Sequence, residues 1–397
     1  MSYKQERIIP EKVFVVFLLQ CNFVFTFLMP DKYLGIADYW YFIFPTSLLM
    51  ITYFCKSGIV FTRASKFLAF FLLYQIIPLF VSVFIVGDTN SGYFLSYVLY
   101  IGFFILLLLY PFTEKDYKKI LNAYILSGAI IGALIAYQKV DYYDGSGYRY
   151  TIQILGHEKF DPNFLGAYLV FPFIILLAKL FRKFSYLNII YFFLISIGVL
   201  YTASRTSMVG CFLGLLFVLR DLMKRKKVKR KSTILFVVIS CVVILYIVLL
   251  VLPEGTFNRL FVYSYMDASN EKRLDDWEYG IKAFQLRPLL GYGFLGEMDI
   301  INMATRTQMI AHNTYIGLIL QYGVIGCTIM IIGLICLWKK IWDIKEQLLL
   351  GVYITTLIVV LMVSAEVAVF LWFPIILTTG ITEIIRRNRK LSLDAFL

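Results

Sequence analysis

Residues 186–220 read YLNIIYFFLISIGVLYTASRTSMVGCFLGLLFVLR. Two apolar runs stand back to back in this stretch, over 186–203 and 206–220, and Arg205 lies between them. An α-helix needs about 20 mostly apolar residues to cross roughly 30 Å of hydrocarbon, and runs of about that length recur along the chain. The stretch therefore predicts two membrane-spanning helices that are joined by almost no loop.

The composition extends this prediction to the whole chain. Its 397 residues are 60% hydrophobic with a mean hydropathy of +0.78, whereas a soluble protein is about 45–50% apolar. We predict an all-α polytopic membrane protein of about twelve transmembrane helices, with both termini cytoplasmic and one large extracytoplasmic loop that carries a surface helix. The first run is read as a retained span, since no small-residue cleavage site follows it. The expected spans are 12–29, 38–55, 67–86, 92–112, 117–137, 163–180, 186–203, 206–220, 232–252, 313–338, 347–365 and 367–385.

Charge placement gives the orientation of the single membrane domain, residues 1–397. With both termini inside, most of the 38 Lys and Arg residues fall on the inner side, as the positive-inside rule requires. The net charge of +13 includes a basic run in the loop 220–231, which we interpret as a topology anchor on anionic lipid. A nucleic-acid partner is not expected, because no separate domain presents this run. The expected location is the bacterial cytoplasmic membrane, with the active site facing outside.

Two outer loops are long, over 138–163 and 253–312. Long loops in compact proteins are usually functional or disordered, and the aromatic residues of the second loop argue against disorder. Within it, an apolar stripe at helical spacing predicts a surface helix, which Ser269 or Asn270 would cap and Pro288 would end. The stripe consists of Leu274, Trp277, Ile281 and Phe284. Arg273, Asp276 and Tyr279 would face away from most of it.

Two arginines and one histidine are candidates for chemistry. Arg205 stands at membrane depth, where an arginine normally faces a partner or a water-filled cavity; the alternative is snorkelling to the headgroups. Arg205 and Arg273 together would suit a phosphate or diphosphate, because guanidinium binds phosphate oxygens bidentately. His312 stands where the large loop re-enters the membrane. It would suit a general base, although a polar residue at a helix end is the alternative.

Other patterns are weaker. Gly291 and Gly293 follow a helix end and are explained either by a plain turn or by the approach of backbone amides to a phosphate. None of the six cysteines lies in the large outer loop, so no disulfide framework is expected. No C-x-x-C pair or histidine cluster predicts a zinc site, and we expect no metal and no cofactor.

The order of these motifs resembles the O-antigen ligase and O-antigen (capsular or exopolysaccharide) polymerase superfamily. The ligase signature is His, then Asn, Ser or Gln, nine residues, and Gly-x-x-Gly; here His312-Asn313 is followed by Thr314–Tyr322 and then Gly323-Val-Ile-Gly326. Three further stretches are similar to family patterns, and the resemblance covers roughly 155–335. They are Ser204-Arg205, Arg273 with Trp277 followed by Pro288-Leu-Leu-Gly-Tyr-Gly, and Asp161-Pro-Asn-Phe-Leu-Gly166.

The resemblance implies metal-independent glycosyl transfer from an undecaprenyl-diphosphate-linked glycan on the outer leaflet. Arg205 and Arg273 would hold the diphosphate and stabilise it as the leaving group, and His312 would take the proton of the attacking hydroxyl. Asn313 would orient His312 or the acceptor. Partners would be the lipid-linked donor and acceptor, membrane lipid, a flippase and a chain-length regulator. The remaining substrate-binding candidates are Arg287, Asp276, Trp277, Gly291, Gly293, Asp161, Asn163 and Arg149.

The resemblance leaves two reactions open. A polymerase joins lipid-linked repeat units, whereas a ligase moves the finished glycan to a final acceptor. A composition rich in Phe and Tyr and poor in Ala favours an AT-rich genome and hence a capsule or exopolysaccharide polymerase. A transporter of lipid-linked oligosaccharides would be expected to show internal repeats, which are not evident. A metal-dependent glycosyltransferase would need outer-loop acids, for which the first outer loop offers only Asp31 and Asp38. A purely structural subunit would leave Arg205 and His312 unexplained.

Overall fold

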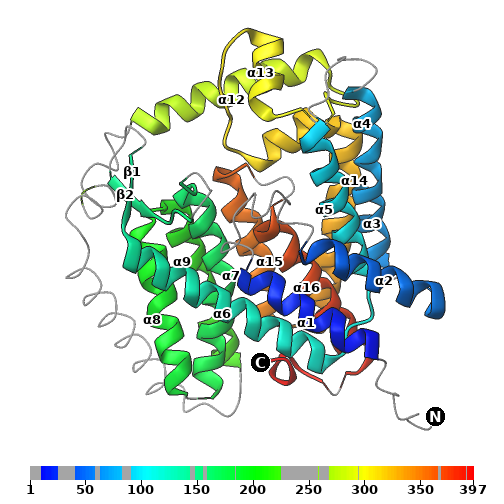
Figure 1. The fold of residues 1–397 in the computed structure, drawn as a ribbon, viewed down its shortest axis with the longest axis vertical. Coiled ribbons are helices and arrows are strands. Elements are labelled where there is room, and N and C mark those ends of the chain that lie inside the picture. The colour runs from blue at the N-terminus through cyan, green and yellow to red at the C-terminus, as the bar shows by residue number, and fades with distance from the viewer. Residues whose placement is uncertain are drawn as a thin grey trace.

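The computed structural model describes residues 10–25, 41–58, 63–82, 91–143, 148–154, 159–183, 185–224, 258, 268–293, 295–364, 368–389 and 391–397. Within these ranges the protein is mainly helical (Figure 1). Helices α12 and α13 lie across one end of the bundle, near the strands β1 and β2 (Figure 1). The helices are α1 (Pro10–Phe25), α2 (Ile43–Ser57), α3 (Arg63–Tyr74), α4 (Ile76–Val81), α5 (Ser91–Leu109), α6 (Glu114–Gln138), α7 (Pro162–Arg182), α8 (Tyr186–Tyr201), α9 (Arg205–Lys224), α12 (Ala268–Leu286), α13 (Glu297–Thr305), α14 (Thr314–Ile344), α15 (Gln347–Val359) and α16 (Val369–Arg387). The single-turn 3-10 helices η5 (Val360–Met362) and η6 (Leu393–Ala395) complete the set.

The expected spans coincide with helices wherever the structure describes them. Among the described residues, α6, α7, α9 and α14 are long and apolar enough to cross a membrane, so the protein is a multi-pass membrane protein. The expected span 232–252 and most of the basic loop 220–231 lie outside the described residues, as do Asp31 and Asp38. The total of twelve spans and the cytoplasmic position of both termini remain predictions.

The expected span 67–86 is not one continuous helix. It is divided into α3 and α4 at Gln75, three residues before Pro78. The pyrrolidine ring of a proline collides with the carbonyl group four residues earlier, here that of Tyr74, and removes one backbone donor. The break therefore follows from Pro78.

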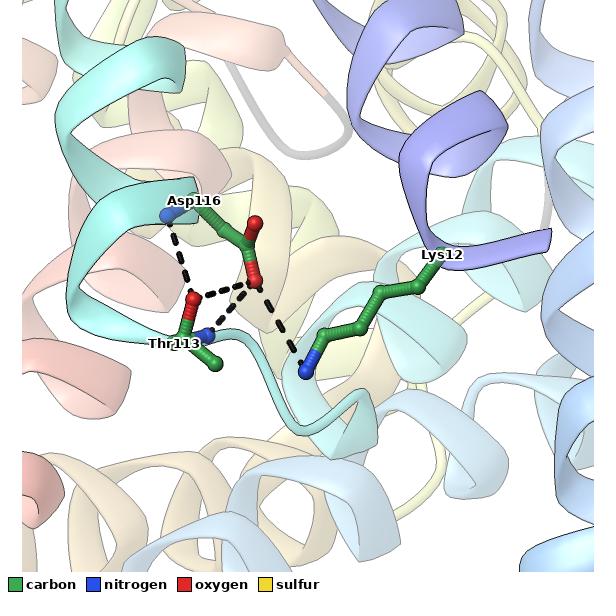
Figure 2. A network of polar contacts seen from close by, with 3 residues as sticks. All are labelled: Lys12, Thr113 and Asp116. Carbon is green, nitrogen blue, oxygen red and sulfur yellow. Dashed lines mark hydrogen bonds and ion pairs between the residues drawn. The ribbon is translucent and has the colours of Figure 1, made fainter. Parts of the chain in front are cut away.

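Helix α6 begins with a complete capping box (Figure 2). The Thr113 hydroxyl accepts from the amide of Asp116 at 3.3 Å, and the Asp116 carboxylate accepts from the amide of Thr113 at 2.8 Å. Lys12 of α1 lies 3.7 Å from the same carboxylate (Figure 2). Two otherwise unsatisfied donors are thus paired, and the ends of α1 and α6 are held together.

Small residues let the central helices approach closely. A Cβ atom at Gly132 of α6 would lie 2.2 Å from the carbonyl oxygen of Leu194 in α8, and one at Gly198 would lie 2.7 Å from the Cα atom of Gly132. Such contacts are typical of helices packed within membranes. Aromatic rings fill the rest of the core, with Phe23, Tyr124 and Trp372 among the largest fully buried side chains.

The outer loop 138–163 is not irregular throughout. It contains an antiparallel hairpin of β1 (Val140–Tyr143) and β2 (Tyr148–Thr151), in which Tyr142 pairs with Arg149. The sequence predicted only a loop for this segment. The hairpin pairs backbone groups that would otherwise have no partners, and its register sets the direction in which Arg149 projects.

Helix α14 is broken at Gly323, whose φ of 61° and ψ of −172° are not helical. Residues 288–293 pair with the backbone exposed by the break. Tyr292 and Gly293 donate to the carbonyl oxygens of Leu320 and Gln321 at 2.8 and 3.0 Å. The amide of Val324 in turn donates to the carbonyl oxygen of Pro288 at 2.8 Å. Because an unsatisfied backbone group at membrane depth is costly, this segment stabilises the break.

Candidate functional site

Helix α12 packs one face against the bundle, and its exposed side carries both apolar and charged side chains. Asp276, Gly280 and Ala283 are buried, whereas Leu274 and Ile281 of the expected apolar stripe are 64% and 52% exposed. A Cβ atom at Gly280 would lie 2.7 Å from the Ile316 side chain, so α12 and α14 approach closely. The expected stripe is thus divided: Trp277 and Phe284 pack against the buried cluster that contains Ala283, and the other two side chains are exposed.

Beneath α12 lies a polar cavity of about 270 Å³. Side chains from the hairpin, the start of α7, α12 and the segment before α14 meet there. It brings together six of the residues singled out from the sequence. Its lining is Tyr142, Arg149, Asp161, Asn163, Arg273, Asp276, Met298, Gln308, Met309, Ile310 and His312.

The start of α7 holds Arg149 in this cavity. Asp161 caps α7, with its side chain accepting from the amide of Asn163 at 2.7 Å. The Asn163 amide oxygen accepts from the Arg149 guanidinium at 3.0 Å. The same guanidinium lies 5.7 Å from the centre of the Tyr142 ring. The Asp-Pro-Asn motif is therefore a helix cap that also fixes a buried arginine.

A second cavity, of about 470 Å³, lies on the other side of Arg273. Arg205, the first residue of α9, lines it together with Arg273, and its other walls are largely apolar. The remaining lining residues are Thr206, Val209, Leu274, Trp277, Ile358, Leu361 and Met362. Arg273 belongs to both cavities, and its guanidinium lies 3.6 Å from the Met362 sulfur. The two arginines predicted to act together thus share one cavity.

The turn before α9 presents Arg205. Ala203 has a φ of 46°, a conformation that residues other than glycine rarely adopt. The surrounding Thr202, Ser204 and Ser207 are buried, and the hydroxyls of Ser204 and Ser207 are 3.0 Å apart. This tight polar turn starts α9 directly after α8 and places Arg205 in the wall of the second cavity.

His312 has a φ of 48° and is half-buried at the wall of the polar cavity. Asn313, which follows it, caps α14: its side-chain oxygen accepts from the amides of Tyr315 and Ile316 at 2.9 and 3.3 Å. Asn313 is buried in this position. Its observed role is to begin the helix directly after His312, and so to position the histidine through the backbone.

The peptide before His312 is held from both sides. The Trp277 indole donates to the carbonyl oxygen of Ala311 at 2.8 Å, and the amide of Ala311 donates to the Glu297 carboxylate at 3.2 Å. The other Glu297 oxygen accepts from the Ser364 hydroxyl at 2.6 Å. Burial raises the pKa of Glu297 to about 7, against the lowering effect of the two hydrogen bonds, and the nearby Asp276 raises it further.

Sequence reasoning missed Glu297. It follows Gly296 and stands two residues before Asp299, and nothing in the local pattern sets it apart from a charge in a solvated loop. Only the folding of α13 against residues 311 and 364 reveals its partners. Tyr142 and the segment Gln308–Ile310 were also not anticipated as parts of the cavity wall.

Four predicted binding residues line neither cavity: Asn313, which caps α14, and Arg287, Gly291 and Gly293. Arg287 stacks on the ring of Tyr292, with its guanidinium 5.0 Å from the ring centre. The Gly291 amide donates to the carbonyl oxygen of Arg287, and that of Gly293 to Gln321. Gly291 and Gly293 have φ values of 71° and 81°, and a Cβ atom on either would lie within 2.5 Å of a backbone carbonyl oxygen. Of the two explanations for these glycines, the structure favours the turn, because their amides already bond to carbonyl groups of the protein.

Comparison with known proteins adds one finding. A search of curated proteins gives no match to the chain. The family model described as O-antigen ligase matches residues 190–331, which include Arg205, Arg273 and His312. The match covers part of the chain, includes residues that line both cavities, and supports the resemblance to the O-antigen ligase and polymerase superfamily.

Proposed function

We propose that this protein polymerises undecaprenyl-diphosphate-linked oligosaccharide repeat units into capsular, exo- or O-antigen polysaccharide on the outer face of the cytoplasmic membrane. The observation that carries the proposal is the position of Arg273 in the wall that separates the two cavities. His312 lies on the polar side of this wall, and Arg205 lies on the apolar side.

The larger cavity suits the lipid diphosphate. Its arginines would bind the phosphate oxygens, since guanidinium is permanently charged and forms paired hydrogen bonds with phosphate. Val209, Leu274 and Leu361 in its wall are exposed apolar side chains, which suit a lipid tail that leaves toward the bilayer. Arg205 and Arg273 would also stabilise the charge that develops on the diphosphate as it departs.

The polar cavity suits sugar. Tyr142, Arg149, Asp161 and Asp276 offer hydrogen-bond donors and acceptors that match sugar hydroxyls. In the proposed step the acceptor hydroxyl attacks the anomeric carbon of the donor, and its proton passes to His312. The bond between that carbon and the diphosphate oxygen breaks as the glycosidic bond forms. Undecaprenyl diphosphate leaves, and a single displacement of this kind inverts the anomeric configuration.

The second candidate is an O-antigen-type ligase that transfers the finished glycan to a final acceptor. The His-Asn-x9-Gly-x-x-Gly signature and the matched family description favour it. The same cavities would serve this reaction, because only the acceptor differs.

One experiment separates the two. The gene is deleted in its host, restored as wild type or as His312→Ala, and the lipid-linked glycan is sized in each strain. We expect His312→Ala to leave only single repeat units on the lipid. Long chains that accumulate on the lipid without reaching their acceptor would identify a ligase, and normal glycan in the His312→Ala strain would contradict both reactions.

A further inference from the structure

Glu297 is a buried carboxylate that the proposed reaction does not itself use. It is the first residue of α13 and is 9% exposed. Both of its oxygens bond to segments distant in sequence: the Ala311 amide at 3.2 Å and the Ser364 hydroxyl at 2.6 Å. Burying a carboxylate is costly, so a carboxylate with two such partners indicates a specific requirement at this position.

What the carboxylate holds is the peptide next to His312. The Ala311 peptide is fixed on its amide side by Glu297 and on its carbonyl side by the Trp277 indole at 2.8 Å. His312 itself has a φ of 48°, which a residue other than glycine keeps only when its surroundings enforce it. With Asn313 capping α14 on the other side, the backbone is determined on both sides of the histidine.

The bond to Ser364 connects this turn to the segment after η5. The adjacent Val363 carbonyl oxygen accepts from the Thr314 hydroxyl at 2.5 Å, so the same segment is also hydrogen-bonded to the first residue of α14. Met362, one residue earlier, contacts Arg273. Glu297 therefore joins α13, the turn before α14 and a segment that contacts the arginine shared by the two cavities.

We propose that Glu297 is a positioning residue: its two hydrogen bonds fix the Ala311 peptide and thereby hold the His312 imidazole in the polar cavity. The proposal rests on the proposed function, in which His312 is the base. The geometry uses the hydrogen-bonding shape of the Glu297 side chain and not its charge, because the Ala311 amide and the Ser364 hydroxyl are both uncharged.

Three variants of the full chain test this: Glu297→Gln, Glu297→Asp and Glu297→Ala. Glutamine keeps an oxygen for the Ala311 amide and can donate to the Ser364 hydroxyl, whereas aspartate keeps the charge but is one methylene too short. Each purified variant is assayed for kcat and for KM of a lipid-linked donor, and its folded fraction is followed by thermal unfolding in detergent.

We expect Glu297→Ala to lower kcat about 10- to 100-fold with the donor KM changed less than about threefold, since a small misplacement of a reacting group has effects of this size. Glu297→Gln should stay within about threefold of wild type, and Glu297→Asp should fall toward the alanine value. Should the alanine variant fail to fold, the order of the glutamine and aspartate variants still decides. An aspartate variant more active than the glutamine variant, or an alanine variant within about twofold of wild type, would overturn the proposal.

A double variant separates this inference from the proposed function. If Glu297 acts only through His312, the kcat of Glu297→Ala combined with His312→Ala equals that of His312→Ala alone. An additional loss in the double variant would mean that Glu297 acts by another route. Full activity of His312→Ala would instead remove the proposed base itself, whereas loss in His312→Ala together with full activity in Glu297→Ala would overturn only the positioning role.

Discussion

The two ends of the motif that runs from His312 to Gly326 are stabilised in different ways. His312 and Gly323 both have positive φ values, at opposite ends of the first turns of α14. The turn at His312 is held by side chains, through Glu297, Trp277 and Asn313. The break at Gly323 is held by backbone, through the paired segment 288–293. The side-chain hydrogen bonds around His312 position a reactive group. The backbone pairing at Gly323 supplies partners for amide and carbonyl groups that the break would leave unpaired at membrane depth.

The two ends of the signature also have different surroundings. The histidine end faces a cavity lined by charged and polar side chains. The glycine end faces the Pro288-Leu-Leu-Gly-Tyr-Gly segment, and a Cβ atom at Gly323 would lie 2.2 Å from the carbonyl oxygen of Leu289. We therefore expect changes at the cavity to reduce the rate of transfer in a folded protein, and changes at the break to reduce stability.

Among the variants that leave His312 in place, the largest effect should come from Arg273→Ala. Removing a charged donor that stabilises a developing negative charge costs about 10²–10³ in kcat. The matched control is Arg287→Ala, because Arg287 stacks on Tyr292 outside both cavities. We expect the control to stay within about threefold of wild type. Transfer rates of the two purified variants check this, and equal losses would show that the cavities do not mark the site.

Next comes Gly323→Ala. The added Cβ atom meets the Leu289 carbonyl oxygen at 2.2 Å, and alanine disfavours a φ of 61°. Strain and overpacking of this kind cost roughly 3 kcal/mol. Thermal unfolding in detergent should show the loss, with the transfer rate per folded molecule nearly unchanged. Wild-type stability in this variant would show that the backbone conformation at Gly323 is not needed for stability.

The sequence predicted much of this arrangement and missed some of it for physical reasons. Hydropathy located the helices because roughly 30 Å of hydrocarbon demands long apolar runs. Arg205 was singled out because an arginine at membrane depth is costly, and His312 because it stands where the large loop was expected to re-enter the membrane. Glu297 was not, since its partners Ala311 and Ser364 are brought together only by tertiary folding. The buried face of α12 could not be read from its apolar stripe, because Leu274 and Ile281 are exposed beside the Glu278–Lys282 ion pair.

A third prediction concerns pH and the folded state. Burial raises the pKa of Glu297 to about 7 from an ordinary value of 4.5. Between these two values the folded protein binds more protons than the unfolded chain, so this group's stabilising contribution is complete below about 4.5 and is lost as the pH rises through about 7. The loss amounts to roughly 3 kcal/mol at most.

Unfolding temperatures measured from pH 5 to pH 8 test this. The wild type should lose stability relative to Glu297→Gln over that interval, because glutamine does not titrate. Asp276 is the carboxylate that acts on Glu297 from α12, so Asp276→Asn should shift the wild-type transition toward lower pH. Parallel curves for wild type and Glu297→Gln would contradict the raised pKa.

The smallest effect is expected for Trp277→Phe. Phenylalanine keeps an aromatic wall for the apolar cavity but loses the hydrogen bond to the carbonyl oxygen of Ala311. A hydrogen bond of this kind contributes about 0.5–1.5 kcal/mol, which corresponds to roughly a threefold to tenfold loss of kcat. Steady-state kinetics measure it. A rise in KM alone would instead assign Trp277 to substrate contact.

The most direct test compares the two ends of the motif in one assay. His312→Ala and Gly323→Ala are purified, and glycan transfer from a lipid-linked donor is measured per folded molecule for each. The account predicts a rate about 10²–10⁴-fold below wild type for His312→Ala in a normally stable protein. It predicts a nearly normal rate for the destabilised Gly323→Ala. A His312→Ala protein that transfers glycan at the wild-type rate would contradict the central claim.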